Sequence, residues 1–173
     1  MFSKLNFFTK KQKKEQPKPQ TKKAVKKQYA PNTKIEYRPN LVKQLTKEHQ
    51  QLLSIFQAII RAVEKGNQTE AKLLLDRFKA KFTGHIIKEN VNFYVYVQHS
   101  VNDPLTLELI KDMRIEMDDI ARAVRNFINE YTPKHVALDA EFVEGFKEIG
   151  SALINRITQE EEHLYPTYQP TMS

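Results

Sequence analysis

The sequence predicts an all-α protein, an antiparallel up-down four-helix bundle that is preceded by a disordered, basic N-terminal tail. From about residue 41 onward, apolar residues recur at alternating steps of three and four, which is typical of helices that bury one face. The helical stretches are separated by connections of a few residues, so neighbouring helices are expected to run antiparallel. A short helical motif also occurs twice, which indicates two related hairpins.

Turn and capping residues set the bounds of each predicted helix. Gly66 ends the first helix, because glycine readily takes up the left-handed conformation that follows a helix. Asp103 and Pro104 open the third as N-cap and first helical residue. Pro133 and Pro166 end the third and the fourth. The four predicted helices cover about residues 41–65, 69–99, 104–131 and 138–164.

Charge divides the chain into a tail and a folded domain. Residues 1–40 contain twelve Lys or Arg and two acidic residues, a net charge of +10, which leaves 16 basic and 19 acidic residues and a net charge of −3 for the remainder. Residues 9–34 are Lys, Gln, Pro and Thr with almost nothing to bury, which predicts disorder. We therefore place the tail at 1–36 and the bundle at 37–170.

The tail suggests partners of opposite charge. It could be a solubilising linker, yet the apolar residues Phe2, Leu5, Phe7 and Phe8 beside its lysines suit weak contact with an anionic membrane. RNA or an acidic protein partner would use the same charges. For the domain itself we expect no nucleic acid, because its net charge is negative.

Composition excludes several classes of protein. The chain has no Cys, which rules out disulfides, thiolate catalysis and Cys-ligated metals. No apolar run approaches the ~20 residues that span a bilayer, and residues 1–8 lack the features of a signal peptide, so we expect a cytoplasmic protein. We expect no enzyme, because the sequence offers neither a nucleophile–base pair nor a phosphate-binding loop.

The repeated motif carries side chains with metal-ligand chemistry. Its matching positions, each 71 residues apart, are His85 and Arg156, Glu89 and Glu160, and Tyr94 and Tyr165. A fainter echo, offset by 68 residues, matches Glu48-His49 with Glu116-Met117. The sequence therefore predicts the same kinds of side chain at equivalent points of two hairpins.

Five ionisable residues interrupt the apolar seams of the predicted helices. They are His49, His85, Glu89, Arg156 and Glu160. Because an unpaired charge in a core costs several kcal/mol of desolvation, their seam positions indicate a paired or metal-binding cluster. Counted from the expected turns, they lie with Met117 in one layer of the core. Two imidazoles with two carboxylates suit Fe(II), Mn(II) or Zn(II).

Four motifs follow one another at these positions. They are Glu48-His49, His85 to Glu89, Glu116-Met117, and Arg156 to Glu160-Glu161 before Leu164-Tyr165-Pro166. In this order, over residues 41–168, the chain resembles the hemerythrin-like, or HHE cation-binding, family. The resemblance implies a four-helix bundle with a metal centre in its core. Family members with a complete centre bind two irons through five His and two bridging carboxylates.

The chain departs from the complete pattern of this family. By position, the resemblance retains four metal ligands, His49, His85, Glu89 and Glu160. Met117 and Arg156 stand where two histidines of the other iron are expected. A two-iron centre that binds O2 is therefore not expected, and the resemblance implies at most one metal ion.

Two interpretations of the core remain open. In the first, one divalent ion, with iron the best candidate, lies among the four retained ligands. In the second, no metal binds, because Arg156 fills the site as a buried partner of the carboxylates. A metal ion together with an inward Arg156 would leave a surplus of one positive charge, so we expect the two to compete.

Two classes of function follow from these interpretations. The resemblance implies a metal-binding, sensory or regulatory module that responds to iron, O2, NO or redox state. The alternative is a metal-free helical interaction module with a protein partner, similar to bacterial anti-sigma-factor bundles in fold alone.

Overall fold

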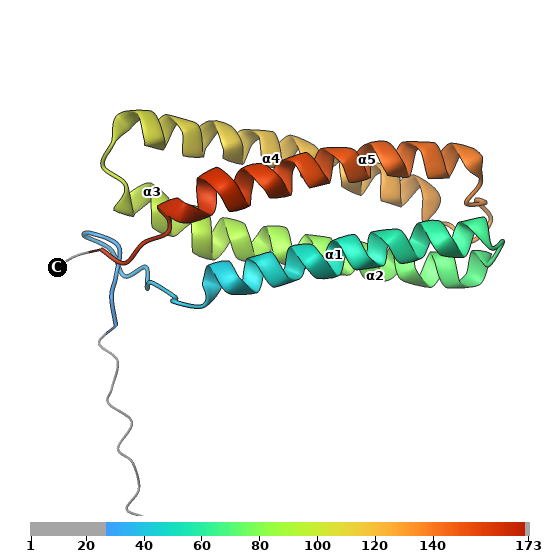
Figure 1. Ribbon diagram of the computed structural model, residues 1–173, viewed down its shortest axis with the longest axis horizontal. Helices are drawn as coiled ribbons and strands as arrows, with labels where there is room; N and C mark the ends of the chain where they lie inside the picture. The colour runs from blue at the N-terminus through green and yellow to red at the C-terminus, as the bar shows by residue number, and fades with distance from the viewer. Residues whose placement is uncertain (1–26, 172–173) are drawn as a thin grey trace, which may run out of the picture.

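The computed structural model describes residues 27–171, which form a bundle of long helices (Figure 1). The predicted all-α fold class is confirmed, since a single bridge between Tyr29 and Glu36 is the only β pairing in this part of the chain. The α-helices are α1 Leu41–Glu64, α2 Gln68–Lys88, α3 Val95–Ser100, α4 Pro104–Tyr131 and α5 Ala140–Gln159. The shorter helical turns are π-helical η1 Glu89–Tyr94, π-helical η2 Glu160–Leu164 and 3₁₀ η3 Tyr165–Thr167.

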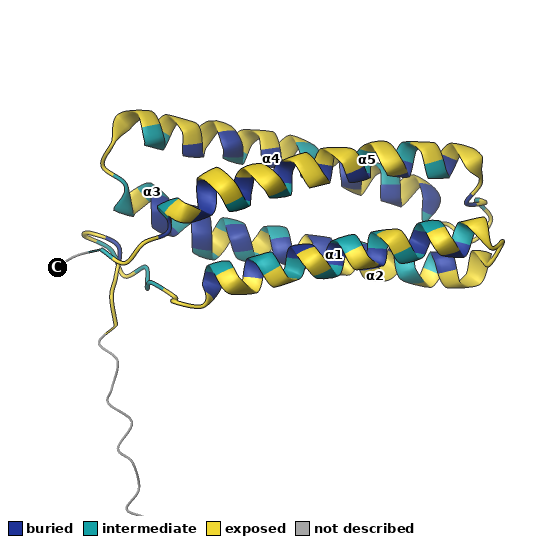
Figure 2. Cartoon of the chain, in the orientation of Figure 1, coloured by how far each residue is buried: buried dark blue, intermediate teal, exposed yellow. Residues whose placement is uncertain are grey.

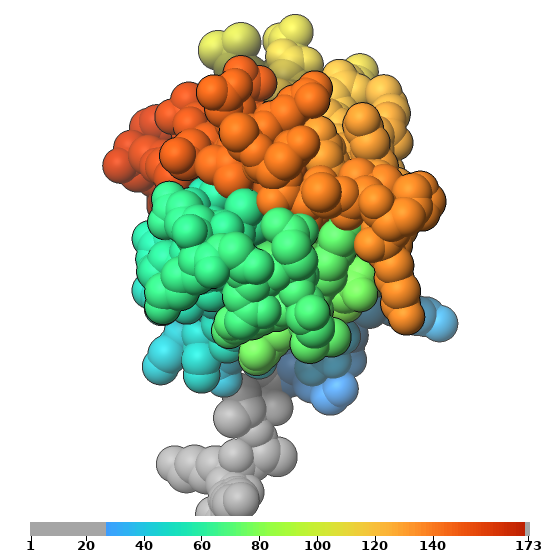
Figure 3. Space-filling model, turned by 90° about the vertical axis from the view of Figure 1, so that its right-hand side faces the viewer, coloured from blue at the N-terminus to red at the C-terminus, as the bar shows by residue number. Residues whose placement is uncertain are grey.

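Two helical hairpins make up the bundle. α1 packs along α2, and the hairpin of α4 and α5 lies over this pair, as the side view and the end view both show (Figure 1, Figure 3). α2, η1 and α3 follow one another directly, so the second helix predicted over 69–99 is right in extent but contains a π-helical turn. The predicted fourth helix likewise passes from α5 into η2. Within residues 27–171, no helix combines the length and hydropathy needed to cross a bilayer.

The helix ends follow the capping chemistry of the sequence. Gly66 has a φ of +71°, the left-handed conformation that ends α1. The side chain of Asn67 accepts a hydrogen bond from Glu70 N at 3.2 Å and caps α2. Asp103 does the same for α4, accepting from Thr106 N at 2.9 Å. These caps fix where each hairpin turns and therefore which residues of neighbouring helices lie at one height.

Two clusters of buried side chains fill the bundle, and Figure 2 shows that the buried faces of the helices point inward. The larger cluster is rich in phenylalanine and includes Phe78, Phe82, Phe142 and Phe146. The smaller cluster lies at the α3 end and includes Phe93, Tyr94, Tyr96, Tyr165 and Tyr168. Along α1, His49 lies between Leu45 of the smaller cluster and Leu52 of the larger one. A polar layer thus separates two apolar regions.

Residues 27–40 pack against the end of the bundle. Ala30 is buried, Arg38 N donates a hydrogen bond to the Tyr168 hydroxyl at 2.9 Å, and Thr171 Oγ1 donates to Tyr29 O at 2.8 Å. The domain boundary predicted at 36/37 stays a prediction, and it falls inside this packed segment. Residues 1–26, which make up most of the predicted disordered tail, lie outside the described part of the chain.

Candidate metal centre

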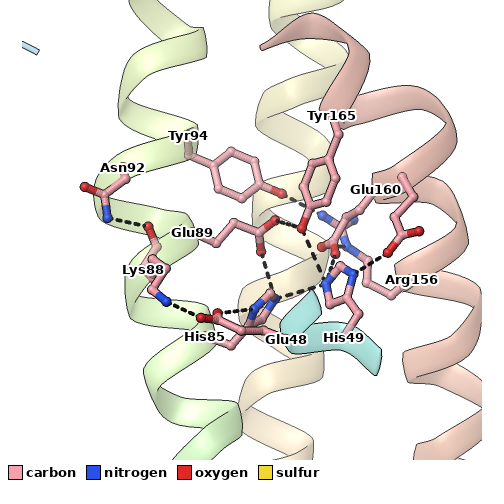
Figure 4. A network of polar contacts seen from close by, with 11 residues as sticks. Glu48, His49, His85, Lys88, Glu89, Asn92, Tyr94, Arg156, Glu160 and Tyr165 are labelled. Carbon is pink, nitrogen blue, oxygen red and sulfur yellow. Dashed lines mark hydrogen bonds and ion pairs between the residues drawn. The ribbon is translucent and has the colours of Figure 1, made fainter. Parts of the chain in front are cut away.

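Five polar or charged residues are buried within residues 27–171, each at most 4% exposed. They are His49, His85, Glu89, Arg156 and Glu160. These are the residues that interrupt the predicted apolar seams, and the structure brings them together in one layer (Figure 4). Met117 is buried as well and lines the same cavity as Arg156 and Glu160. That any of them binds a metal ion stays a prediction.

Both buried carboxylates begin a π-helical turn. Glu89 is the first residue of η1 and Glu160 the first residue of η2. A π-helix pairs residue i with residue i+5, and the backbone N–H of Tyr165 bonds to Glu160 O in this way. The fifth residue after each glutamate therefore returns to the same side of the helix. This places Tyr94 and Tyr165 beside the polar layer.

A carboxylate holds each imidazole at its Nδ1 atom. His49 Nδ1 lies 2.8 Å from Glu161 Oε1, and His85 Nδ1 lies 3.2 Å from Glu48 Oε2. Glu48 is also paired with Lys88. Because an ionised carboxylate can only accept a hydrogen bond, Nδ1 carries the proton in both rings. A neutral ring then presents the lone pair of Nε2 to the core, whereas a doubly protonated ring donates a hydrogen bond from Nε2.

The two Nε2 atoms face each other at 3.1 Å. Two lone pairs at this distance repel one another unless a proton or a metal cation lies between the rings. Glu160 Oε2 lies 3.2 Å from His49 Nε2, whereas Glu89 Oε2 lies 3.9 Å from His85 Nε2. The closest donor atoms of the layer thus come from both histidines and Glu160.

These spacings fit a divalent cation. With metal–ligand bonds of about 2.1 Å and neighbouring ligands roughly at right or tetrahedral angles, two ligand atoms lie about 3.0–3.4 Å apart. The donor atoms of His49, His85 and Glu160 all lie within 4.8 Å of one another, and Glu89 is outside this group. Imidazole and carboxylate together suit non-haem iron, and zinc and manganese accept them too.

Arg156 occupies the other half of the layer. Its side chain is 1% exposed, and Nε donates to Glu160 Oε1 at 2.6 Å. Nη2 donates to the Tyr94 hydroxyl at 2.6 Å, and Nη1 donates to Glu116 Oε2 at 3.3 Å. Glu160 is therefore shared, since one oxygen binds Arg156 and the other faces His49.

The contacts of Arg156 repeat those of His85 at matching positions of the sequence repeat. Glu116 binds Arg156 from α4 as Glu48 binds His85 from α1. Met117, which matches His49, offers only a thioether, a weak acceptor. The second half of the layer keeps the arrangement of the first half, but a guanidinium and a thioether replace its two imidazoles.

Burial and charge give the two core carboxyl groups different pKa values. Burial, reinforced by the negative charge of Glu160, raises the pKa of Glu89 to about 8. Burial also opposes ionisation of Glu160, but the hydrogen bond from His49 and the charge of Arg156 outweigh it and lower the pKa of that carboxyl. The Tyr165 hydroxyl donates to Glu89 Oε1 at 3.1 Å. In the absence of a metal ion, Glu160 is thus the carboxylate that carries the charge.

Beside the imidazole pair lies a cavity of about 20 Å³. It is walled by the polar layer and by apolar side chains, including Leu52, Phe78, Phe82, Met117 and Leu153. This volume is enough for about one water molecule. The cavity therefore has room for a ligand of about the size of one water molecule.

Sequence reasoning did not assign a role to the residues that surround the layer. They are Glu48, Lys88, Tyr94, Glu116 and Tyr165, whereas Glu161 was expected to compete with Glu160 as a ligand. The repeat did contain the signal for most of them, because it pairs Glu48 with Glu116 and Tyr94 with Tyr165. The glutamates among them lie beside the predicted apolar seams, where a charged residue is usually solvated, so the sequence gave no reason to place them at the site.

Inward-facing His and Glu side chains on antiparallel helices are the donor groups with which helical bundles build metal sites in their cores. A sequence model described as hemerythrin HHE cation binding domain matches residues 40–168. The chain therefore belongs to the hemerythrin HHE cation-binding family, as the motifs indicated. Neither a curated protein nor a solved structure showed significant similarity to it.

Proposed function

We propose that the protein binds a single divalent metal ion, with non-haem iron the best fit, and that Arg156 supplies the second positive charge of the centre. The carrying observation is the pair of Nε2 atoms 3.1 Å apart in rings whose Nδ1 atoms are held by carboxylates. His49, His85 and Glu160 would hold the ion, with Glu89 the nearest further carboxylate. Iron, when bound, supplies Lewis acidity and one-electron redox chemistry.

The contacts of Glu160 support a centre that contains both cations. Its Oε1 accepts from Arg156 at 2.6 Å, while its Oε2 lies 3.2 Å from His49 Nε2. Glu116, 3.3 Å from Arg156 Nη1, offsets the surplus charge that argued for competition. Arg156 and the metal ion would then occupy separate halves of the layer, instead of competing as the sequence led us to expect.

A sensory or regulatory role suits this centre better than catalysis. The adjoining cavity of about 20 Å³ leaves room for a ligand the size of one water. A substrate with a carbon skeleton would have no place beside the imidazole pair. We therefore assign the site to sensing of the metal ion, or of a very small ligand that reaches it.

Metal content tests the proposal. The full chain, purified without a His tag, is loaded anaerobically with Fe(II), desalted, and analysed for iron by mass spectrometry. We expect one iron per chain, and we expect His49→Ala and His85→Ala to remove it. His99→Ala is the control, since His99 is exposed and binds only Val95 O at 2.9 Å. Equal iron in all four proteins would exclude the imidazole pair as the site.

A gain of bound metal would test whether Met117 and Arg156 replace metal ligands in the second half of the polar layer. The double variant Met117→His/Arg156→His restores two imidazoles where the repeat places them. We expect bound iron to rise from one toward two per chain. No rise in a folded double variant would contradict the view that Arg156 and Met117 replace metal ligands.

A metal-free interaction module is the second candidate function. It is favoured by the completeness of hydrogen bonding, because Ser100 Oγ is the only buried side-chain polar atom without a partner in residues 27–171. The layer can thus form without a metal ion, with a proton between the two Nε2 atoms. Cooperative melting in chelator, together with no iron uptake, would support this function and exclude the first.

A further inference from the structure

The two hairpins of the bundle carry opposite charge. Residues 41–88, which include α1 and α2, contain nine basic and four acidic residues, a net charge of +5. Residues 104–164, which include α4 and α5, contain seven basic and thirteen acidic residues, a net charge of −6. Because the hairpins form opposite halves of the bundle (Figure 3), this segregation turns the small net charge of the domain into two faces of opposite sign.

A groove on the α1–α2 hairpin gathers part of the positive charge. It has a volume of about 500 Å³, and its lining includes Lys47, Arg77 and Lys81 but no acidic residue. All three side chains are exposed. Lys81 Nζ donates to Gln51 Oε1 at 2.8 Å, a neutral partner that leaves its charge uncompensated. The groove therefore favours anionic groups.

The same face exposes an apolar side chain and lacks exposed aromatic rings. Leu73 is 67% exposed, and it precedes Arg77 and Lys81 at four-residue steps, so the three share one stripe of α2. Tyr29, the exposed aromatic residue of the described chain, lies outside α1 and α2. Cations beside an exposed leucine are typical of surfaces that contact lipid, whereas single-stranded nucleic acid is usually held by aromatic stacking.

We propose that the α1–α2 face docks on an anionic phospholipid surface and that the acidic α4–α5 hairpin faces away from it. The sequence adds charge of the same sign, because residues 1–26 contain nine basic residues and one acidic residue. The described chain begins beside the start of α1, on the α1–α2 side of the bundle (Figure 1). The membrane contact of the tail expected from sequence thus extends onto the folded domain. This proposal does not depend on metal binding.

Vesicle co-sedimentation of the full chain tests the proposal. The vesicles contain phosphatidylcholine with 40% phosphatidylserine in low salt. The variant Lys47→Gln/Arg77→Gln/Lys81→Gln removes three charges from the groove. Each Lys or Arg near an anionic leaflet contributes about 1 kcal/mol, so partitioning should weaken roughly 100-fold. The control Lys111→Gln/Arg125→Gln/Lys147→Gln removes three exposed charges from α4 and α5 and should bind as the wild type does.

Comparing the wild type with the two variants distinguishes binding by the α1–α2 face from binding by the tail and from a general effect of net charge. The N-terminal sequence is identical in the three proteins, so equal binding by all three would mean that the tail alone binds, which overturns the proposal. Equal weakening in both variants would mean that only net charge matters, which also overturns it. Equally tight binding of the wild type to pure phosphatidylcholine vesicles would contradict the assignment of an anionic lipid surface. If the groove variant lost binding to an RNA duplex but kept its binding to the vesicles, the assigned partner would also be wrong. Circular dichroism checks that both variants remain folded.

Discussion

Replacing Arg156 with Ala should strongly destabilise the metal-free protein. The guanidinium is 1% exposed and donates to Glu160, Tyr94 and Glu116 at 2.6, 2.6 and 3.3 Å. Without it, Glu160 Oε1 loses its partner in the core, and only His49, 3.2 Å from Oε2, remains beside the carboxylate. Removing one partner of a buried ion pair costs about 3–5 kcal/mol. For a chain of this length, each kcal/mol lowers the Tm by about 2–4 °C, so a fall of about 6–20 °C is expected.

Urea unfolding in the presence of a chelator measures this loss as the difference in the free energy of unfolding. Arg122→Ala is the matched control, because the Arg122 side chain is 65% exposed and pairs only with Asp119 at 3.0 Å. A surface pair of this kind contributes about 0–1 kcal/mol. Arg156→Lys keeps the charge but loses the planar fork of donors, so its stability should fall between those of the wild type and Arg156→Ala.

The metal-loaded proteins complete this experiment. If Arg156 and the metal ion use different oxygens of Glu160, Fe(II) should still stabilise Arg156→Ala, because a ligand that binds only the folded state raises its stability. A loss no larger than that of Arg122→Ala would refute the reasoning, since it would mean that Arg156 and Glu160 form no buried pair.

Other substitutions probe the packing around the centre. Tyr165→Phe removes the hydroxyl that donates to Glu89 at 3.1 Å, and urea unfolding should show a loss of about 1 kcal/mol; no loss would mean that this hydrogen bond does not form. Gly150→Ala would place a Cβ 2.3 Å from Phe56 Cζ, and overpacking should cost about 1–3 kcal/mol in the same assay. Gly84→Ala meets nothing within 4 Å and should stabilise α2 by about 0.5–1 kcal/mol. Equal Tm values for the two alanine variants would contradict the packing described here.

The layout of the bundle and the composition of its polar layer were accessible from the sequence because both rest on local rules. Gly66 and Asp103 mark turns through backbone and capping chemistry, and those turns fix the heights of neighbouring helices. His49 and Glu160 could be recognised because they are ionisable residues at seam positions, which the helical pattern predicts to be buried.

Other features of the site depend on tertiary contacts that no local pattern encodes. The sequence placed Glu89 among four equal ligands, but its carboxylate lies 3.9 Å from the nearer imidazole and outside the closest group. Likewise, the hydrogen bond from Arg156 to the Tyr94 hydroxyl at 2.6 Å joins two helices that are far apart in the sequence. The packing of Ala30 against the bundle could not be foreseen in a segment poor in apolar residues.

The π-helical turns set the register of each hairpin beyond the site. A π-helical turn contains about one residue more than an α-helical turn, so η1 and η2 each act as a one-residue insertion in a long helix. Each residue of an α-helix turns the chain by about 100°. Five residues of a π-helical turn and four residues of an α-helix each make about one full turn, so the helix that follows keeps the phase of the helix before it despite the extra residue. Deleting one residue from either turn should therefore restore a regular α-helix and leave Tyr94 or Tyr165 facing the core. The π-helical turns thus keep Tyr94 and Tyr165 of the smaller cluster on the same side of the helix as Glu89 and Glu160, although each hairpin contains one residue more than a regular α-helix would need.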